Sequence, residues 1–293
     1  MQRSGSEANS NSSIYIKPYL KWAGGKRQLL AEIRKHLPKN IDAYTYYEPF
    51  IGAGALFFDL KPKRAVINDS NTQLILTYRT VRDSVEDLIL LLQEYEKKNS
   101  KDFFYEIRNA DRDEKKFNEA TDIEKTARLI FLNKTCFNGL YRVNSRGLFN
   151  VPYGKNKNPS ICEATVLRCI SEYLRTSEIT ILNCDFEQAV ITANNESFIY
   201  FDPPYHSPGN TNFSAYQANV FGENEQERLR NTMIEMTNRG IKCLLSNSDT
   251  EYIREIYRFD FFDILPVQAK RAINSNSQGR GFVNELLIRN WKG

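Results

Sequence analysis

TYYEPFIGAGALFFDL, residues 45–60, joins one apolar stretch to another through two closely spaced glycines. TYYEPF favours a β-strand, IGAG a tight turn, and ALFFDL the first turns of a helix. A second unit follows at once, because AVIND, residues 65–69, predicts a strand ending in an acid, and residues 70–81 predict a helix capped by Ser70. This alternation of strand and helix predicts a parallel sheet covered by helices.

The alternation stops near residue 83 and gives way to helices alone. Apolar residues recur three or four apart in 84–98, 101–113 and 121–134, which predicts three helices with no strand between them. FNGLYRVNSRGLFNVPYG, residues 137–154, alternates apolar and polar residues and has glycines at turn positions, so it predicts a β-hairpin. A further helix at 161–174 closes this segment.

The strand and helix pattern then resumes. The remaining predicted elements are strands at 178–186, 197–201, 241–247, 261–267 and 282–290, with a helix at 225–239. We therefore expect an α/β protein with a Rossmann-like, doubly wound sheet and an inserted helical domain that carries the hairpin. The expected boundaries are a disordered tail at 1–13, a sheet domain at 14–82 and 178–293, and the inserted domain at 83–177.

The overall composition is that of a soluble globular protein, with 41% apolar and 26% charged residues among 293. No stretch has the length of a membrane span or the apolar core of a signal peptide, so we expect a cytoplasmic protein without membrane contact. Five irregularly spaced cysteines and two histidines argue against a disulfide framework and against a zinc site. We expect buried free thiols and no metal.

The distribution of charge is more informative than the formal net charge of +4. Residues 125–157 contain seven basic residues and no acid, and residues 264–284 contain three basic residues and no acid. A solvated charged face normally mixes both signs. These two stretches therefore predict surfaces that contact phosphate.

Polar and glycine positions cluster where the first strands end, which is where parallel sheets bind ligands. Gly52 and Gly54 form an FxGxG turn without the third glycine that cradles a pyrophosphate, which favours a cofactor that lacks phosphate. Asp69 is placed either to accept hydrogen bonds from ribose hydroxyls or to cap the next helix. Trp22 and Lys26, in KWAGGK, form either part of the core or a cationic cradle over a ligand.

DPPY, at 202–205, follows a fully apolar strand and has an unusual set of hydrogen-bonding groups. Pro203 and Pro204 have no N–H group, so this corner offers carbonyl acceptors and the Asp202 carboxylate but no donors. Such a corner suits an exocyclic amino group, with Tyr205 stacked on the ring of a base flipped out of its duplex. An amine held there can attack the methyl group of a sulfonium cofactor. A plain turn and a proline-rich ligand for another domain are the alternatives.

KWAGGK, EPFIGAG, IND, NCDF and FDPPY, in this order, resemble the Dam family of AdoMet-dependent DNA adenine methyltransferases. The resemblance covers residues 19–290 and is strongest to the GATC-specific members of DpnII-type restriction–modification systems. It implies a methyltransferase sheet, S-adenosyl-L-methionine (AdoMet) as cofactor, double-stranded DNA as substrate and methylation of adenine N6. It also implies a cognate restriction endonuclease as a functional, not physical, partner.

The resemblance assigns roles to individual residues. The catalytic residues it implies are Asp202, Pro203, Pro204 and Tyr205. The cofactor residues it implies are Trp22, Lys26, Gly52, Gly54, Asp69, Asp185, Phe186 and Asp202. The DNA-binding residues it implies are Lys21, Phe137, Asn138, Leu140, Arg142, Asn144, Arg271, Asn274, Ser275 and Arg280. The chain departs from some members at Phe137, where they have Tyr, and at Ala53, where they have Gly.

Three alternatives to this function remain at the level of the sequence. The acceptor corner suits the exocyclic amine of cytosine or a base in RNA equally well. The hairpin could be purely structural, with arginines that are merely exposed. A non-catalytic DNA-binding relative on the same scaffold is the third possibility. Residues 206–221 form a candidate lid over the flipped base.

Overall fold

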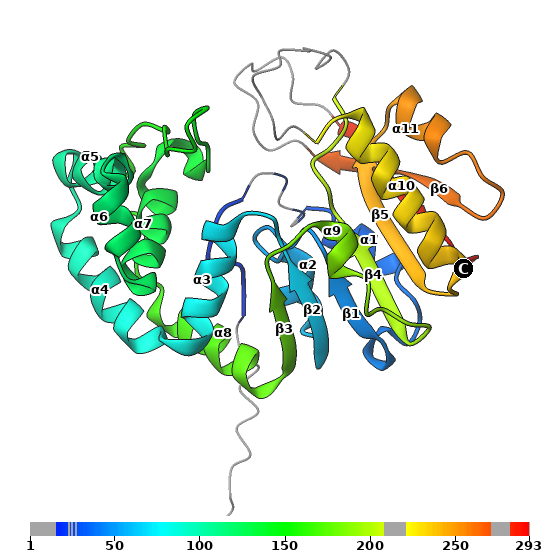
Figure 1. Ribbon diagram of the computed structural model, residues 1–293, viewed down its shortest axis with the longest axis horizontal. Helices are drawn as coiled ribbons and strands as arrows, with labels where there is room; N and C mark the ends of the chain where they lie inside the picture. Colours follow the sequence, from blue (N-terminus) through cyan, green and yellow to red (C-terminus); the bar gives the residue numbers. More distant parts are fainter. Residues whose placement is uncertain are drawn as a thin grey trace, which may run out of the picture.

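The computed structural model describes residues 16–22, 24, 26, 28–207, 221–270 and 282–292. Within these residues one seven-stranded sheet runs through the molecule (Figure 1). Its strands, in spatial order, are β3 (Glu178–Leu182), β2 (Arg64–Asn68), β1 (Thr45–Glu48), β4 (Ser197–Phe201), β5 (Lys242–Ser248), β7 (Phe282–Arg289) and β6 (Asp263–Lys270).

The predicted parallel sheet is confirmed for β1 to β5, whose neighbouring pairs are all parallel. The last two strands differ from that prediction, because β7 is antiparallel to both β5 and β6. Residues 271–281 make a connection shorter than the crossover of about a dozen or more residues that a parallel pair requires, and an antiparallel pair of β6 and β7 needs no crossover.

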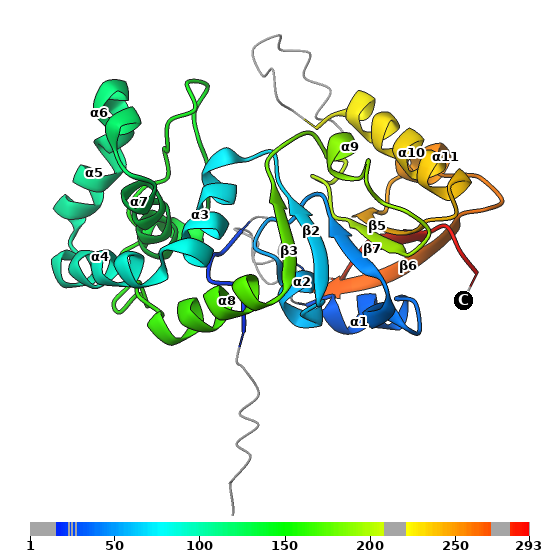
Figure 2. The ribbon, with the colours of Figure 1, turned by 60° about the horizontal axis from the view of Figure 1, so that its bottom comes forward.

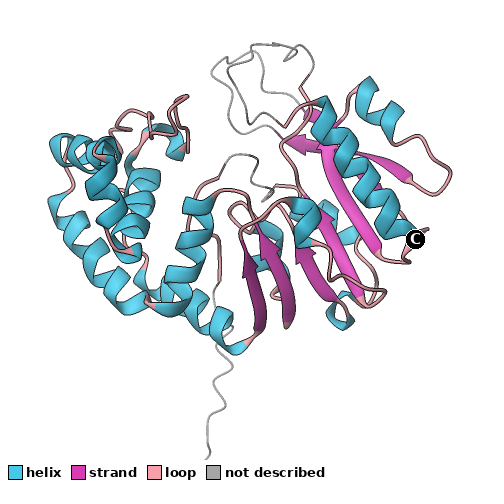
Figure 3. Ribbon diagram, in the orientation of Figure 1, coloured by secondary structure: helices cyan, strands magenta, loops and turns pink. Residues whose placement is uncertain are grey.

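Helices cover both faces of the sheet, which gives the doubly wound arrangement expected (Figures 1 and 3). One face packs against α1 (Leu30–Lys35), α2 (Ala55–Leu60) and α3 (Thr72–Asp83). The other packs against α9 (Phe186–Ala189), α10 (Glu223–Asn238) and α11 (Glu251–Ile256). Adjacent strand residues point to opposite faces, so that Tyr46 lies in the first core and Tyr47 in the second. The fold is thus the Rossmann-like, doubly wound α/β fold that the sequence predicts.

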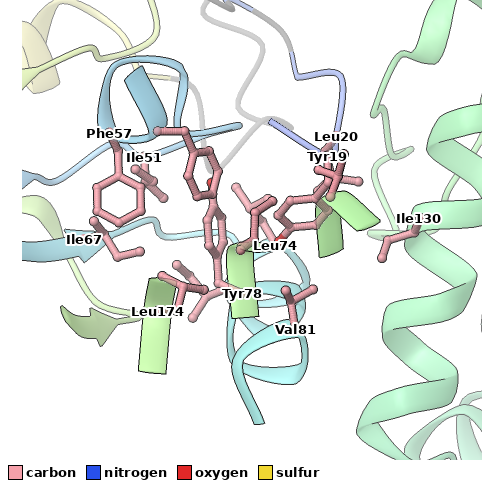
Figure 4. Packing of buried hydrophobic residues seen from close by; sticks show 14 of the residues in the cluster. Tyr19, Leu20, Ile51, Phe57, Ile67, Leu74, Tyr78, Val81, Ile130 and Leu174 are labelled. Carbon is pink, nitrogen blue, oxygen red and sulfur yellow. The ribbon is translucent and has the colours of Figure 1, made fainter. Parts of the chain in front are cut away.

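The helical segment lies beyond the β3 edge of the sheet (Figures 1 and 2). It consists of α4 (Val85–Lys98), α5 (Lys101–Asn109), α6 (Glu114–Glu119), α7 (Asp122–Thr135) and α8 (Ala164–Thr176). Its apolar residues join the first core of the sheet without a break. Figure 4 shows Ile67 of β2, Tyr78 and Val81 of α3, and Ile130 of α7 in this one cluster. The segment is therefore packed against the sheet domain through α3.

Several element boundaries differ from the prediction. The helix expected at 70–81 is capped by Asn71, not Ser70, because the Asn71 side chain accepts a hydrogen bond from the Leu74 amide at 3.0 Å. The short helix α6 was not predicted, since its six residues are too few for an apolar period to show.

The segment 137–154 is less regular than the predicted hairpin. Its antiparallel pairing consists of two isolated bridges, Cys136 with Tyr153 and Val143 with Phe149. The 3₁₀ turn Phe137–Gly139 interrupts the first arm, with Asn138 in the left-handed region at φ 56°. We call residues 137–154 the hairpin segment below.

The predicted tail at 1–13 and most of the candidate lid at 206–221 lie outside the described residues. The thiols are free, as expected, but only Cys136 and Cys243 are buried, and Cys162, Cys169 and Cys184 are partly exposed. None of the helices in the described ranges is long and apolar enough to cross a membrane.

Candidate active site

The predicted site residues gather at the edge of the sheet where the parallel strands end. Strands β1, β2 and β4 lead directly into the glycine turn, into Asp69 and into DPPY. In Figures 1 and 2 the hairpin segment lies on the same side of the molecule as this edge. Parallel strands place their carboxyl ends together, and this is why motifs far apart in the sequence meet here.

The glycine turn is tied to the strand beside it. The Gly52 amide donates a hydrogen bond to Oδ2 of Asp69 at 3.1 Å, and the Ile51 amide donates to the Asn68 carbonyl at 2.8 Å. Gly54 has a left-handed φ of 69°, and a Cβ atom there would lie 2.8 Å from the Tyr78 hydroxyl. Gly54 is therefore required for the packing of the turn against α3, in addition to the cofactor role expected of it.

Asp69 does not cap α3, since Asn71 does so. Its two carboxylate oxygens accept hydrogen bonds from the backbone amides of Gly52 and Asn71, at 3.1 and 2.9 Å. Burial raises the pKa of Asp69, and these two hydrogen bonds act against that rise. Each carboxylate oxygen can accept a second hydrogen bond, so the carboxylate still has free acceptor sites. Its predicted contact with ribose stays a prediction.

Asp202 lies directly after the fully buried strand β4 and keeps only 17% of its side chain exposed. Burial and the nearby Glu285 carboxylate raise its pKa to about 6, while the Lys26 ammonium limits that rise. Its Oδ1 atom lies 2.9 Å from Nζ of Lys26 in an ion pair. Within the described part of the chain, Oδ1 has no well-aligned hydrogen bond. Asp202 therefore presents a buried acceptor that a ligand can use.

Lys26 brings a positive charge into this corner. Its side chain is 7% exposed, and its Nζ atom donates a hydrogen bond to the Gly24 carbonyl at 2.6 Å. The same atom lies 4.3 Å from the centre of the Tyr205 ring, in a cation–π contact. The structure thus brings Lys26 of KWAGGK next to Asp202 and Tyr205 of DPPY.

The Tyr205 hydroxyl donates a hydrogen bond to Oε2 of Glu285 at 2.7 Å. Burial, together with the carboxylates of Asp202 and Glu285, raises the pKa of Tyr205 well above its ordinary value. Glu285 lies on β7 and was not among the predicted site residues. It belongs to no motif, and nothing in the sequence of β7, FVNELLIR, marks it as a site residue.

The backbone of the DPPY loop is held by a buried amide network. Gln226 Nε2 donates to the Pro204 carbonyl at 2.9 Å, and Asn247 Nδ2 donates to Oε1 of Gln226 at 2.9 Å. Asn247 Oδ1 in turn accepts from the His206 amide at 3.1 Å. No described residue donates to the Pro203 carbonyl, so this acceptor remains available beside Asp202.

A second buried acid, Glu48, ends strand β1 and was also missed. Its side chain is 3% exposed, and the Tyr46 hydroxyl donates to it at 2.7 Å. Burial raises the pKa of Glu48 well above its ordinary value, and the charge of Asp202 adds to this rise. Burial therefore favours the uncharged form of Glu48.

Trp22 connects the glycine turn to the hairpin segment. Its indole stacks on the Tyr141 ring with centroids 4.7 Å apart and planes at 21°. A Cβ atom on Gly52 would lie 3.2 Å from Cδ1 of Trp22, so the indole rests directly against the turn. Trp22 is only half-buried, which leaves part of it open to a ligand.

Asp185 and Phe186 are both engaged by the protein. Asp185 caps α9 by accepting a hydrogen bond from the Glu187 amide and forms an ion pair with Arg228 at 3.0 Å. Phe186 is 4% exposed and packs on Phe50, with the Arg228 guanidinium 5.0 Å from its ring centre. Their predicted place beside the cofactor's adenine ring stays a prediction.

The residues expected to contact DNA fall into two groups. Phe137 and Leu140 are 52% and 42% exposed at the base of the hairpin segment. Lys21 lies beside them, because the Asn133 side chain bonds the Lys21 amide and carbonyl at 2.9 and 2.7 Å. Asn138 is exposed in the same turn. These four residues form one exposed group.

The second group lies further along the hairpin segment. Arg142 is exposed and its Nε atom donates to Oδ1 of Asn150 at 2.8 Å. Asn144 accepts hydrogen bonds from the amides of Arg146 and Leu148, so its side chain shapes the turn. The predicted contacts of Arg271, Asn274, Ser275 and Arg280 lie outside the described residues.

Two of the seven basic residues in 125–157 are not available to phosphate. Arg128 is buried and forms an ion pair with Asp111 at 2.6 Å. Lys134 is 14% exposed and pairs with Glu163 at 2.6 Å. The expectation that this stretch faces phosphate as a whole is therefore wrong for these residues, whose acidic partners lie outside the stretch.

Comparisons with known proteins match nearly the whole chain. A family model described as D12 class N6 adenine-specific DNA methyltransferase matches residues 22–273. The chain is 41% identical over 281 residues to the type II methyltransferase M1.LlaDCHI of Lactococcus lactis subsp. cremoris, covering 96% of this chain and 97% of that protein. It is 40% identical over 293 residues to the type II methyltransferase M.MjaIII of Methanocaldococcus jannaschii, covering 94% and 99%. It is 33% identical over 276 residues to the DNA adenine methylase of Escherichia coli K12, covering 92% and 94%.

Proposed function

Because the chain belongs to the D12 class of N6 adenine-specific DNA methyltransferases, we propose that it methylates adenine in GATC sites of duplex DNA after flipping that base out of the helix. Membership of the class sets the reaction. The chain is a site-specific, AdoMet-dependent DNA methyltransferase that acts on N6 of adenine. The target sequence and the flipped base are the proposed parts.

The site suits AdoMet, the methyl donor of this class. The glycine turn lacks the third glycine of a pyrophosphate cradle, and Asp69 and Asp202 offer carboxylates with free acceptor sites. The residues proposed to hold the cofactor are Trp22, Lys26, Gly52, Gly54, Asp69, Asp185, Phe186 and Asp202. When bound, AdoMet supplies an electrophilic methyl group on its sulfonium.

The observation that carries the proposal is the corner formed by Asp202, Lys26 and Tyr205. The Asp202 carboxylate and the Pro203 carbonyl accept the two hydrogens of the adenine amino group and orient its lone pair outward. Tyr205 stacks on the base. Asp202 stabilises the positive charge that develops on nitrogen and accepts the proton that is lost after transfer. With a pKa of about 6, Asp202 is mainly a carboxylate at neutral pH.

The position of this corner supports the proposed base flipping. The adenine amino group is paired and stacked inside a duplex, and Asp202 is 17% exposed at the end of a buried strand. The two can meet only if the nucleotide leaves the stack, at a cost of a few kcal/mol.

We assign DNA reading to the segment 83–177, as an inserted recognition domain. The exposed group of Lys21, Phe137, Asn138 and Leu140 contacts the bases near the flipped adenine. Arg142 donates to a guanine edge, the commonest specific contact in the major groove. Asn144, Arg271, Asn274, Ser275 and Arg280 complete the proposed contacts. The relatives named as type II methyltransferases support a cognate restriction endonuclease as the functional partner.

The test is methyl transfer from tritiated AdoMet to matched duplexes. One carries GATC, a second carries the same bases in scrambled order, and a third carries GATC with N6-methyladenine already on both strands. We expect label in the first duplex alone, on adenine N6 after digestion to nucleosides. Equal labelling of the first two removes the GATC assignment, and label on cytosine removes the assignment of the base.

A further inference from the structure

The proposed reaction assigns no role to Glu285, the acid that accepts a hydrogen bond from the Tyr205 hydroxyl. We propose that Glu285 is the positioning residue for Tyr205, holding the ring in the orientation that receives the flipped adenine. The inference rests on the proposed function, because it assumes that Tyr205 stacks on the target base.

The register of β7 brings Glu285 to the site. In the pairing of β5 and β7, Glu285 lies opposite Ser248, the last residue of β5. Strand β5 ends at the same edge as β4, after which Asp202 and Tyr205 follow. Glu285, in the middle of β7, thus lies level with the carboxyl ends of the parallel strands.

The hydrogen bond from Tyr205 to Glu285 restrains the side-chain torsions of Tyr205, which the rigid backbone does not fix. The two prolines restrict the backbone before Tyr205, but the side chain still rotates about two bonds. The phenolic oxygen lies on the axis of the ring, so an acceptor 2.7 Å away holds the direction of that axis. Lys26, 4.3 Å from the ring centre, covers one face. The proposed position of the base is therefore the opposite face.

Glu285 also affects the pKa of Asp202. Among the described residues, the titratable groups on which the charge of Glu285 acts are Asp202, Tyr205 and Tyr200, and Lys26 in turn pairs with Asp202. The carboxylate of Glu285 helps to raise the pKa of Asp202 to about 6, against the effect of Lys26. Replacing Glu285 with a neutral acceptor therefore lowers the pKa of Asp202 while keeping a partner for the Tyr205 hydroxyl.

The experiment compares Glu285→Ala, Glu285→Gln and Tyr205→Phe in the full chain, with kcat, KM for a GATC duplex and the pH profile of kcat/KM as readouts. Glu285→Ala is expected to lower kcat roughly 10- to 100-fold, the factor for losing a hydrogen bond to a charged group. Tyr205→Phe is expected to lose about as much, and the double variant no more than either. Glu285→Gln is expected to restore kcat to within about threefold of wild type.

The pH profile separates positioning from a merely structural role. In kcat/KM the acid limb reports the free enzyme, so wild type should lose activity below a pH of about 6. In Glu285→Gln this limb moves to lower pH, because the pKa of Asp202 falls. Ser246→Ala is the matched control, since it also removes the partner of a buried tyrosine hydroxyl, that of Tyr200 at 2.7 Å. It should lower thermal stability and leave the acid limb in place.

The outcomes are distinct. If Glu285→Ala folds and keeps wild-type kcat, or if the acid limb of Glu285→Gln does not move, the inference is overturned. If Glu285→Ala fails to fold, Tyr205→Phe and Glu285→Gln decide by the same criteria. Failure of the proposed function looks different, because wild type itself would then place no methyl group on adenine.

Discussion

The ammonium of Lys26 lies 2.9 Å from the Asp202 carboxylate and occupies the corner in which the adenine amino group is proposed to bind. Lysine and substrate amine therefore share one acceptor. Lys26 also lowers the pKa of Asp202, which burial would otherwise raise further. Lys26 thus connects the KWAGGK segment, which is expected to bind the cofactor, with the proposed catalytic carboxylate of Asp202.

Replacing Lys26 with Met should move the acid limb of kcat/KM upward from a pH of about 6, because Asp202 loses the charge that holds its pKa down. AdoMet binding, measured by calorimetry, should weaken in the same variant. Lys35→Met is the control, since Lys35 is 67% exposed and pairs with Glu32 on its own helix. An unchanged acid limb in Lys26→Met would show that the ion pair does not exist in solution.

Asp202→Asn should abolish methyl transfer and stabilise the protein at high pH. The folded-state pKa of Asp202 is about 6, against about 3.9 for an unfolded aspartate, so the folded protein binds this proton more tightly. The stability from Asp202 is thus complete below a pH of about 4 and is lost as the pH rises through about 6. The variant should gain about 2–3 kcal/mol in free energy of unfolding at pH 8 and almost nothing at pH 4, as measured in urea. A variant that gains nothing at pH 8 contradicts the raised pKa.

Glu48→Gln should leave the free energy of unfolding at pH 7 within about 1 kcal/mol of wild type, because burial raises the pKa of Glu48 and favours its uncharged form, and glutamine keeps an acceptor for the Tyr46 hydroxyl. Glu48→Ala should cost about 2–4 kcal/mol, since it leaves a cavity and an unpaired buried hydroxyl. Equal destabilisation by both changes would mean that the carboxylate is charged. Denaturant titration at pH 7 measures both.

Gly139→Ala should weaken DNA binding more than Gly147→Ala. Both glycines have left-handed φ values, 66° and 75°, so alanine costs about 1 kcal/mol at each. Only at Gly139 does the new Cβ atom collide, at 2.4 Å from Cδ of Lys21 and 3.2 Å from the Asn133 carbonyl. Gly147 has no such atom within 4 Å. Fluorescence anisotropy with a labelled GATC duplex measures the difference, and equal losses would show that Lys21 need not lie against the hairpin segment.

Alanine substitutions at Arg128 and Arg142 should have different effects, the first on protein stability and the second on DNA sequence preference. Arg128→Ala removes one of the two arginines that pair with the buried Asp111, the other being Arg112, and should cost about 1–3 kcal/mol in free energy of unfolding. Arg142→Ala should leave stability within about 0.5 kcal/mol and reduce the preference for GATC over scrambled DNA by about 1–3 kcal/mol. Thermal unfolding and competitive binding test the two. If Arg142→Ala weakens binding to both duplexes equally, Arg142 contacts phosphate rather than a base.

Much of the site could be predicted because its motifs end strands. In TYYEPF, AVIND and SFIYFDPPY a buried strand runs into polar residues, and a parallel sheet brings such ends together. This reasoning places Lys26 and Asp202 at the same site but does not predict the ion pair between them. Glu285, Glu48 and Gln226 could not be identified, because each lies in an ordinary strand or helix and has a role only through its neighbour.

By itself the sequence determined the alternation of strands and helices, the helical insertion and the acceptor-only corner of DPPY. These depend on local properties, namely apolar periodicity and the proline ring. Only the tertiary structure decided that β7 runs antiparallel and carries Glu285 to Tyr205, and that Arg128 is paired within the core. Such contacts join residues far apart in the chain, Tyr205 with Glu285 and Arg128 with Asp111, so burial and charge at these positions depend on packing that no local pattern records.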